Sequence, residues 1–263
     1  NARYNSGGAL INADFKTEMV LGHVPNHYAS AKFGTVAALD AADPATTVWS
    51  AGDDTNPNRV SRKNFPTSAA TLYMASTEAA DAGKEITIEY SDADNHLRTV
   101  NVNLSGQTPV SLGVSGLDAN TAYISGADQV LAGNVFITQN SNFTNGVPNT
   151  LGDTICFIKA SDGRSSQATH RVPRNSHTTI TNSYVAISRA NGSATSARID
   201  LKIKPLGGSW YVLRPYITTS SLLIDTKETI VLEAGSLVEF CIDEISDGDT
   251  NCVVIFDYEI VES

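Results

Sequence analysis

The chain has 263 residues, a hydrophobic content of 41% and a formal net charge of −10. This hydrophobic content supports one large core or two ordinary ones and excludes an intrinsically disordered chain. The acidic balance argues against a nucleic-acid-binding surface, which needs clustered Lys and Arg. No run approaches the ~20 apolar residues of a membrane-spanning helix, so we expect neither nucleic acid nor a membrane as a partner.

The first thirty residues predict an extended N-terminal arm. The stretch NARYNSGGALINADFKTEMVLGHVPNHYAS is Gly-rich at first, then carries a short apolar patch, and lacks a core pattern of its own. Such arms become ordered on a partner. His23 and His27 are four residues apart, but Pro25 disfavours the helix that would align them as metal ligands. We expect loop histidines here, and the start at Asn1 fits either a processed chain or a missing N-terminal piece.

Residues 31–173 predict a β-rich unit. Its clearest element is a β-hairpin over 85–104, in which apolar and polar residues alternate in two runs joined by the polar link SDADNHL. Helical signals are limited to VAALDAAD (36–43) and STEAADAG (76–83), which predict a turn or two each before a proline and a glycine stop them. Neither segment is long enough to organise a domain, so the unit is mainly β.

The clearest boundary falls in HRVPRNSHT (170–178), where a strand ends at a Val-Pro step. About seven short strands follow in about ninety residues, which is typical of a β-sandwich of the jelly-roll or immunoglobulin-like type. Alternation is clearest over 198–204, and ETIVLEAGSLVEFCIDE and VVIFDYEIV give the last three strands. The sequence therefore predicts an all-β fold in three parts: an N-terminal arm (1–30), a β-rich domain (31–173) and a β-sandwich domain (174–263).

The stretch ISDGDTNCVV raises the question of a calcium loop, because Asp247, Asp249 and Asn251 alternate along it. An EF-hand loop needs Gly at its sixth position and a bidentate Glu at its twelfth. Cys252 and Tyr258 occupy those positions. An EF-hand is therefore excluded, whereas a looser calcium site shared with a neighbouring subunit stays open.

The same stretch predicts a β-hairpin that turns at Asp247-Gly248, since Asp-Gly is a preferred hairpin dipeptide between alternating apolar strands. In that register Cys241 faces out and Cys252 faces in, so the alternation opposes a disulfide between them. Together with Cys156 they form an odd set at no metal-ligand spacing. We therefore expect free thiols and assembly in a reducing cytoplasm.

No pattern nominates a catalytic, cofactor-binding or metal-binding residue, and we expect no enzyme. A nucleophile elbow and a Gly-rich phosphate loop are both missing from the sequence. His96, His170 and His177 are isolated, and the last two flank a boundary where an interface is expected. One local positive cluster predicts a solvated loop or, alternatively, a contact with an acidic neighbouring subunit: Arg59, Arg62 and Lys63.

Six stretches follow one another along the chain: TTVWSAGDD (46–54), FPTSAATLYMASTEAADAG (65–83), NLSGQTPVSLG (103–113), GNVFI (133–137), ATHRVPRNSHTTI (168–180) and ARIDLKIKPLGGSWY (197–211). Taken in this serial order, they resemble a group of uncharacterised tailed-bacteriophage virion proteins of the marine-phage type. In that group an aromatic-plus-Gly turn precedes an aromatic-Pro-Thr segment, and a Val-Pro step leads into a C-terminal β-sandwich with a Gly-Gly turn. Arg174 departs from the small residue expected after that step.

The resemblance implies a non-enzymatic structural role in the virion, as a capsid decoration or cement or as a head or tail accessory component. Its partners would be other virion proteins and further copies of the chain, with assembly in the host cytoplasm. Contacts are expected from the arm, from the loop 52–66 and from exposed sandwich edges. One alternative is a receptor- or glycan-binding module of a tail fibre, with Trp49, Trp210 and Tyr216 as candidate aromatics, although both tryptophans are expected in packing roles. A polysaccharide hydrolase is a remoter alternative.

Overall fold

The computed structural model describes residues 24–126, 130–189, 192 and 195–262. Within them the chain is almost entirely β, with seventeen strands and three short 3₁₀ turns, which confirms the all-β class. In this described part no helix has the length and the apolar character needed to cross a bilayer. Residues 1–23 of the predicted arm lie outside the described residues.

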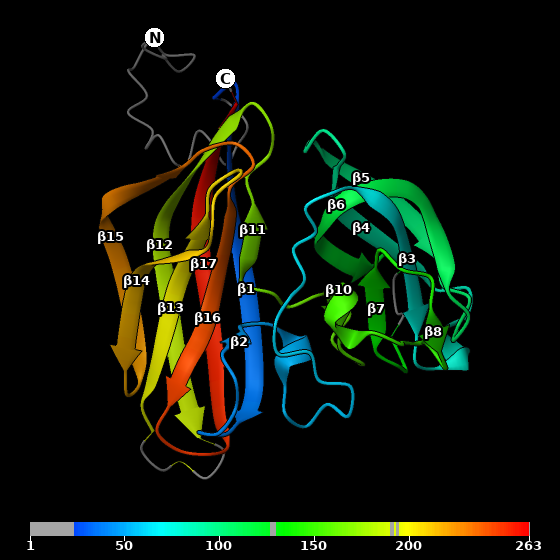
Figure 1. Cartoon of the computed structure of the whole chain (residues 1–263), viewed down its shortest axis with the longest axis horizontal. Helices are drawn as coiled ribbons and strands as arrows, with labels where there is room; N and C mark the ends of the chain where they lie inside the picture. The colour runs from blue at the N-terminus through cyan, green and yellow to red at the C-terminus, as the bar shows by residue number, and fades with distance from the viewer. Residues whose placement is uncertain (1–23, 127–129, 190–191, 193–194, 263) are drawn as a thin grey trace, which may run out of the picture.

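The sandwich consists of two antiparallel sheets that face each other across one core (Figure 1). One sheet has the order β1 (His27–Leu39), β17 (Thr250–Glu262), β12 (Ser176–Arg189) and β15 (Ser221–Leu232). In the other sheet β16 (Leu237–Ile245) is followed by β13 (Ala197–Lys204) and β14 (Tyr211–Thr218), while β2 (Thr46–Thr47) and β11 (Thr169–Arg171) share the outer edge of β16. Alternate residues of both sheets fill the core, among them Val185, Leu201, Phe240, Val254 and Phe256.

The strand order identifies the sandwich as a jelly roll. We count β2 and β11 as one strand position. Each sandwich strand is then followed along the chain by a strand of the opposite sheet, except that β13 and β14 lie side by side in the same sheet. The first strand, β1, lies beside the last, β17. An immunoglobulin-like sandwich instead joins several sequence neighbours within one sheet. The structure thus decides between the two sandwich types that the sequence left open.

One strand position of the jelly roll is split by a large insertion. β2 and β11 pair with consecutive parts of β16, and the chain leaves this strand position at Val48 and returns to it at Ala168. The Val48 amide donates to the Phe240 carbonyl (2.9 Å), the Phe240 amide donates to the Ala168 carbonyl (3.0 Å), and the Ala168 amide donates to the Val48 carbonyl (2.8 Å). The chain between these residues forms the second β unit, which stands beside the sandwich (Figure 1).

The inserted unit is a six-stranded antiparallel sheet with its own apolar core. Its hairpin pairs Glu85 with Asn103 at one end and Ser91 with Leu97 at the other, so the hairpin predicted over 85–104 is confirmed. Two further short strands, β8 (Phe143–Thr144) and β9 (Val147–Pro148), pair with each other. The sheet order is β10 (Thr154–Ile158), β7 (Val135–Thr138), β3 (Ala70–Ser76), β6 (Val110–Ile124), β4 (Glu85–Asp92) and β5 (Leu97–Asn103).

The structure divides the chain differently from the boundaries drawn on the sequence at residues 31 and 174. β1 runs without a break from His27 to Leu39 and pairs with β17 along that length, so the first boundary cuts through a sandwich strand. The second boundary lies close to Thr169, where the chain returns to the sandwich. The early boundary is wrong because β1 is rich in alanine, and only its pairing with a distant strand makes it β.

The helical turn expected over 36–43 is also wrong. Its first four residues end β1, with a bulge where Ala38 takes a φ of +55°. Pairing with β17 overrides the weak helical preference of Ala37 and Ala38. The turn expected over 76–83 is a single 3₁₀ turn at Ala79–Asp81, whereas the strand expected over 198–204 is confirmed as β13.

The terminal strands do not form the predicted hairpin. Both β16 and β17 exist, but each lies in a different sheet of the sandwich, and the turn between them carries the chain across the core. Cys252 points into the core, as expected. Cys241 lies on the opposite face of its sheet and is nevertheless fully buried, because Arg62 of the loop 52–66 covers it and donates from Nη1 to Sγ at 2.9 Å. All three cysteines are free.

Candidate functional site

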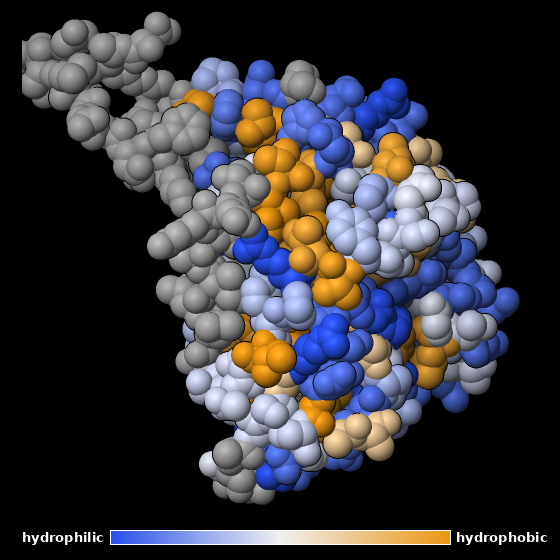
Figure 2. Space-filling view, turned by 60° about the vertical axis from the view of Figure 1, so that its left-hand side comes forward, coloured by the Kyte–Doolittle hydropathy of each residue, from blue (hydrophilic) through white to orange (hydrophobic). Residues whose placement is uncertain are grey.

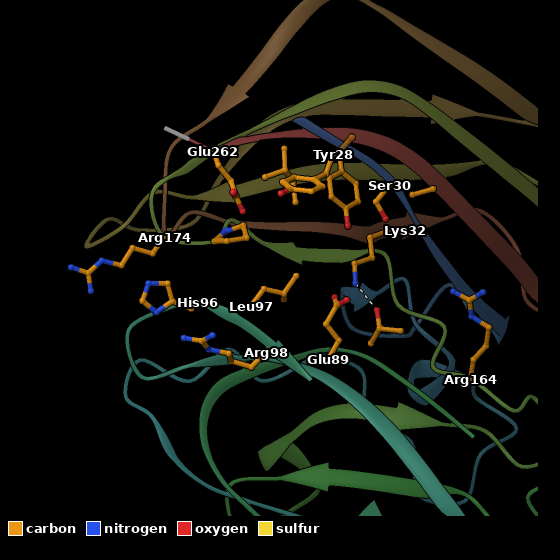
Figure 3. Close-up of a pocket in the computed structure, with 15 residues that line it drawn as sticks. Tyr28, Ser30, Lys32, Glu89, His96, Leu97, Arg98, Arg164, Arg174 and Glu262 are labelled. Atoms are coloured by element: carbon orange, nitrogen blue, oxygen red, sulfur yellow. Dashed lines mark hydrogen bonds between the residues drawn. The ribbon is translucent and has the colours of Figure 1, made fainter. Parts of the chain in front are cut away.

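A cleft of about 680 Å³ lies between the two units, where the β4–β5 hairpin faces β1 and β17 (Figure 3). Its walls come from six separate stretches of the chain, so it exists only because the insertion folds back against the sandwich. The charged and aromatic residues that line it are Tyr28, Lys32, Glu89, His96, Arg98, Arg164, Arg174, Tyr258 and Glu262.

Lys32 forms the floor of the cleft. Its side chain is buried, and Nζ donates to the Asn120 carbonyl (2.6 Å) and to Thr121 Oγ1 (2.8 Å) on β6. Burial lowers the pKa of Lys32 to about 8, and the nearby Glu89 carboxylate opposes that shift. Figure 3 shows the Lys32 and Glu89 side chains directed toward each other. This lysine thus joins β1 of the sandwich to the inserted unit.

The rim of the cleft is cationic. Figure 3 shows Arg98 and Arg174 at one end, beside His96, and Arg164 at the other end. Arg98 lies 3.1 Å from Asp92 and Arg174 lies 3.3 Å from Asp94, but all these side chains except that of Asp92 are more than half exposed, so the pairs hold the arginines weakly. Arg164 is exposed and forms no ion pair with a described residue.

The charge of the cleft is opposite to that of the molecule. Four cations and two carboxylates line it, which leaves a balance of about +2 in a chain whose net charge is −10. We call the group Lys32, Arg98, Arg164 and Arg174 the cationic cleft. Exposed apolar surface lies beside these charges, since Tyr28 is 52% and Leu97 is 41% exposed. Such a lining can hold an anionic group by charge and hydrogen bonds while its neutral part packs on the aromatic ring.

A buried group of charges lies close to this cleft, and one of its members, Arg171, belongs to the sandwich. Lys63 Nζ lies 2.8 Å from Asp118 Oδ1, and both side chains are at most 1% exposed. Arg171 of β11 approaches the other carboxylate oxygen at 3.8 Å, and the Lys63 ammonium lies 5.2 Å from the centre of the Phe65 ring. Gln167 adds a hydrogen bond of 2.6 Å to the Asn120 carbonyl. These contacts fix the walls of the cleft relative to each other.

The predicted positive cluster is neither a solvated loop nor a free surface patch. Arg59 pairs with Asp43 (2.6 Å) and Asp54 (2.8 Å). Arg62 pairs at 2.6 Å with Glu239, whose carboxylate is completely buried. Lys63 is the buried partner of Asp118 described above. The acidic partners of the cluster belong to the same chain, so this part of the loop 52–66 is held against the rest of the molecule. The alternative, a contact with an acidic neighbouring subunit, stays a prediction.

The histidines are dispersed through the molecule. His170 is buried against Tyr258, with ring centres 4.4 Å apart, and burial lowers its pKa to about 3. His96 lies on the cleft, with Nδ1 3.6 Å from Asp92. His177 lies 3.2 Å from Glu233 at the surface. Two more positions complete the set: His27 begins β1, and His23 lies outside the described residues.

The candidate glycan-binding aromatics have packing roles. Trp49 is 1% exposed, and its Nε1 donates to the Val60 carbonyl at 2.8 Å. Trp210 packs on Phe65, with ring centres 5.2 Å apart. Tyr216 is 9% exposed and belongs to the sandwich core. The sequence did not single out Tyr28, the exposed aromatic of the cleft, because nothing in its local pattern marks it.

The stretch ISDGDTNCVV closes one end of the sandwich. The Asn251 side-chain oxygen accepts a hydrogen bond from the Ala38 amide (2.9 Å), and Asp40 accepts one from the Asp249 amide (3.3 Å). Asp247 lies 3.9 Å from Arg189. In the part of the chain that the structure describes, no three acidic, histidine or cysteine side chains are grouped as metal ligands. A calcium site shared with a neighbouring subunit stays a prediction.

The described chain is therefore a jelly roll that carries an inserted β unit and a cationic cleft between the two. No protein-family model and no curated protein matches it.

Solved structures that match over most of the chain include viral and phage proteins. The structure of infectious bursal disease virus, Gt strain, is 11% identical, with 95% of this chain and 78% of that chain covered and a TM-score of 0.19. The VP2 subviral particle of the same virus is 10% identical, with 94% and 77% covered and a TM-score of 0.17. The PBSX exported protein XepA is 11% identical, with 97% and 93% covered and a TM-score of 0.19. At such TM-scores these matches carry no argument about fold or function.

Proposed function

We propose that this chain is a non-enzymatic structural protein of a bacteriophage virion, which decorates or cements the capsid or forms an accessory component of the head or tail. The observation that carries the proposal is the architecture itself: a jelly roll that holds a second β unit against it through buried contacts of Lys32 and Arg171. Jelly rolls recur in viral capsids and also in lectins, so the fold supports the role by analogy only. The serial resemblance to phage virion proteins adds to it.

The exposed apolar surface of the sandwich also supports assembly. Figure 2 shows apolar side chains grouped among polar ones on the face that includes the β14 and β15 side of the sandwich. Large apolar residues are exposed there, with Ile217 and Leu206 at 76%, Val231 at 56% and Tyr211 at 48%. Apolar patches of this kind mark contact sites with other proteins.

Particles that lack this protein provide the test. Purified chain is expected to bind such particles at saturable sites, as measured by co-sedimentation and by density at fixed positions in an electron-microscopy reconstruction. A protein that stays monomeric and does not bind those particles contradicts the proposal.

A glycan-binding module of a tail fibre is the second candidate, and Tyr28 in the cationic cleft is the observation that favours it. Aromatic rings and arginines together suit acidic sugars. A glycan array that gives no signal, measured on a sample that binds particles, decides against this candidate. Binding to an acidic glycan that is lost in Tyr28→Ala decides for it.

A further inference from the structure

The molecule has a second charged feature at the far end of β1 from the cationic cleft. Asp40, Glu244, Asp247 and Asp249 lie at or beside the two turns that close this end of the sandwich, and we call them the acidic tip. Glu244 is 72% exposed and lies 3.7 Å from Arg198, and Asp247 is 45% exposed and lies 3.9 Å from Arg189. Asp40 and Asp249 are exposed, and neither forms an ion pair with a described residue.

The two features cannot meet within one molecule. Tyr28 and Lys32 lie in the cleft near the beginning of β1, whereas Asp40 follows its last residue. A strand advances about 3.3 Å per residue, so the twelve residues from 28 to 40 separate cleft and tip by about 40 Å. β17 lies antiparallel beside β1 and runs from the tip to the cleft: its first residues follow the tip, and Glu262 near its end lines the cleft. Any neutralisation between them must therefore occur between molecules.

We infer that the cationic cleft of one copy receives the acidic tip of another copy. This inference rests on the proposed structural role and names one of its contacts. The charges are complementary, and each side keeps a group without an ion pair inside its own described chain: Arg164 in the cleft, and Asp40 and Asp249 at the tip. At the tip, four residues join β16 to β17, and two of them, Asp247 and Asp249, are acidic.

The geometry sets the kind of assembly. A contact between two different surfaces is heterologous, so a joined pair of copies still has one free cleft and one free tip. Copies then join head to tail and form a ring if the rotation closes, or a filament if it does not. Because the contact depends on exposed charges, it forms at low ionic strength and weakens as salt is added.

Two complementary variants test the inference. The cleft variant carries Arg164→Glu and Arg174→Glu, and the tip variant carries Asp247→Asn and Asp249→Asn, which keep the shape of the turn. The four altered side chains are exposed or half-buried, so each variant is expected to fold, as circular dichroism checks. A double variant of two exposed carboxylates outside the tip, Glu78→Gln with Glu233→Gln, is the matched control.

Sedimentation velocity at about 20 mM and about 500 mM salt gives the readout. Wild type and the control are expected to form oligomers at low salt, with an association constant at least about tenfold lower at high salt. Each variant alone is expected to stay monomeric. An equimolar mixture of the two is expected to form heterodimers and stop there, because the pair holds one intact cleft and one intact tip. A monomeric wild type at low salt, or a mixture that forms no heterodimer, overturns the inference.

Failure here is distinguishable from failure of the proposed function. If wild type binds particles that lack it while the mixed variants form no heterodimer, the head-to-tail contact is wrong and the virion role stands. If an acidic glycan binds the cleft and the chain remains monomeric, the cleft has a different occupant, which also overturns the inference.

Discussion

Gly34 lies on β1 under the point where the inserted unit leaves and rejoins the sandwich. A Cβ at this position falls 2.3 Å from the Val48 carbonyl oxygen and 2.4 Å from the Ala168 amide nitrogen, both of them backbone atoms. Because neither atom can move without breaking the closure of the insertion, we expect Gly34→Ala to lower the free energy of unfolding by about 3 kcal/mol or more. Urea denaturation followed by circular dichroism measures this change.

Gly152→Ala is the control for that prediction, because a Cβ at residue 152 meets no atom within 4 Å. Its effect is expected to stay within about 0.5 kcal/mol. Equal effects of the two substitutions contradict the steric explanation.

His170 links stability to acid. Burial, with smaller contributions from Lys32 and Lys63, lowers its pKa from 6.5 to about 3. As the pH falls below 6.5, the His170 imidazole becomes protonated in the unfolded chain but stays neutral in the folded chain. The stability that the neutral His170 contributes is therefore fully present above pH 6.5 and is lost as the pH falls toward 3. Between pH 6.5 and pH 4 the loss is about 3 kcal/mol. His170→Phe is expected to remove that part of the pH dependence in urea denaturation.

The exposed His177 provides the comparison, and His177→Gln is expected to keep the acid sensitivity of the wild type. A His170→Phe protein that loses the same free energy between pH 6.5 and pH 4 shows that other groups cause it.

Among the elements, β14 is an edge strand of the sandwich with exposed apolar residues, and Pro215 lies in its centre, paired in register with Asp200. Proline has no amide hydrogen, so it interrupts the row of donors that another strand needs for pairing. We expect Pro215→Thr to increase irregular aggregation at high protein concentration, with the stability changed by less than about 1 kcal/mol. Static light scattering against concentration measures the effect.

Pro57→Thr in the exposed part of the loop 52–66 is the matched substitution and is expected to leave the scattering unchanged. Should Pro215→Thr scatter no more than wild type, the proline has no protective role at this edge.

At the scale of the whole molecule, the buried Asp118 of the inserted unit pairs with Lys63 of the loop 52–66 (2.8 Å) and faces Arg171 of the sandwich (3.8 Å). Asp118→Asn removes the counter-charge and leaves a buried ammonium group, which costs about 3 kcal/mol in comparable cases. We expect that loss in chemical denaturation, together with faster limited proteolysis between the units. Asp94→Asn removes an exposed partner of Arg174 and is expected to change stability by less than about 0.5 kcal/mol. Similar losses from both substitutions contradict the proposed role of the buried pair.

The sequence by itself determined the β class, the 85–104 hairpin and most of the sandwich strands, because alternation with period two directly encodes a strand with one buried face. It also indicated a second β unit and a return to the sandwich near residue 170. The start of that sandwich at His27 was missed, since the small residues of β1 carry little pattern.

Only the tertiary structure decided the pairing of strands, and with it the jelly roll, the insertion and the cleft. The sequence pattern predicts one hairpin for β16 and β17, yet the two strands belong to opposite sheets. The pattern also predicts a solvated loop for the positive cluster, yet its side chains form ion pairs with Asp43, Glu239 and Asp118. The cleft joins residues as distant in sequence as Tyr28 and Glu262. Alternation specifies which face of a strand is buried but not which strand or unit covers it, and that choice depends on contacts between residues far apart in the chain.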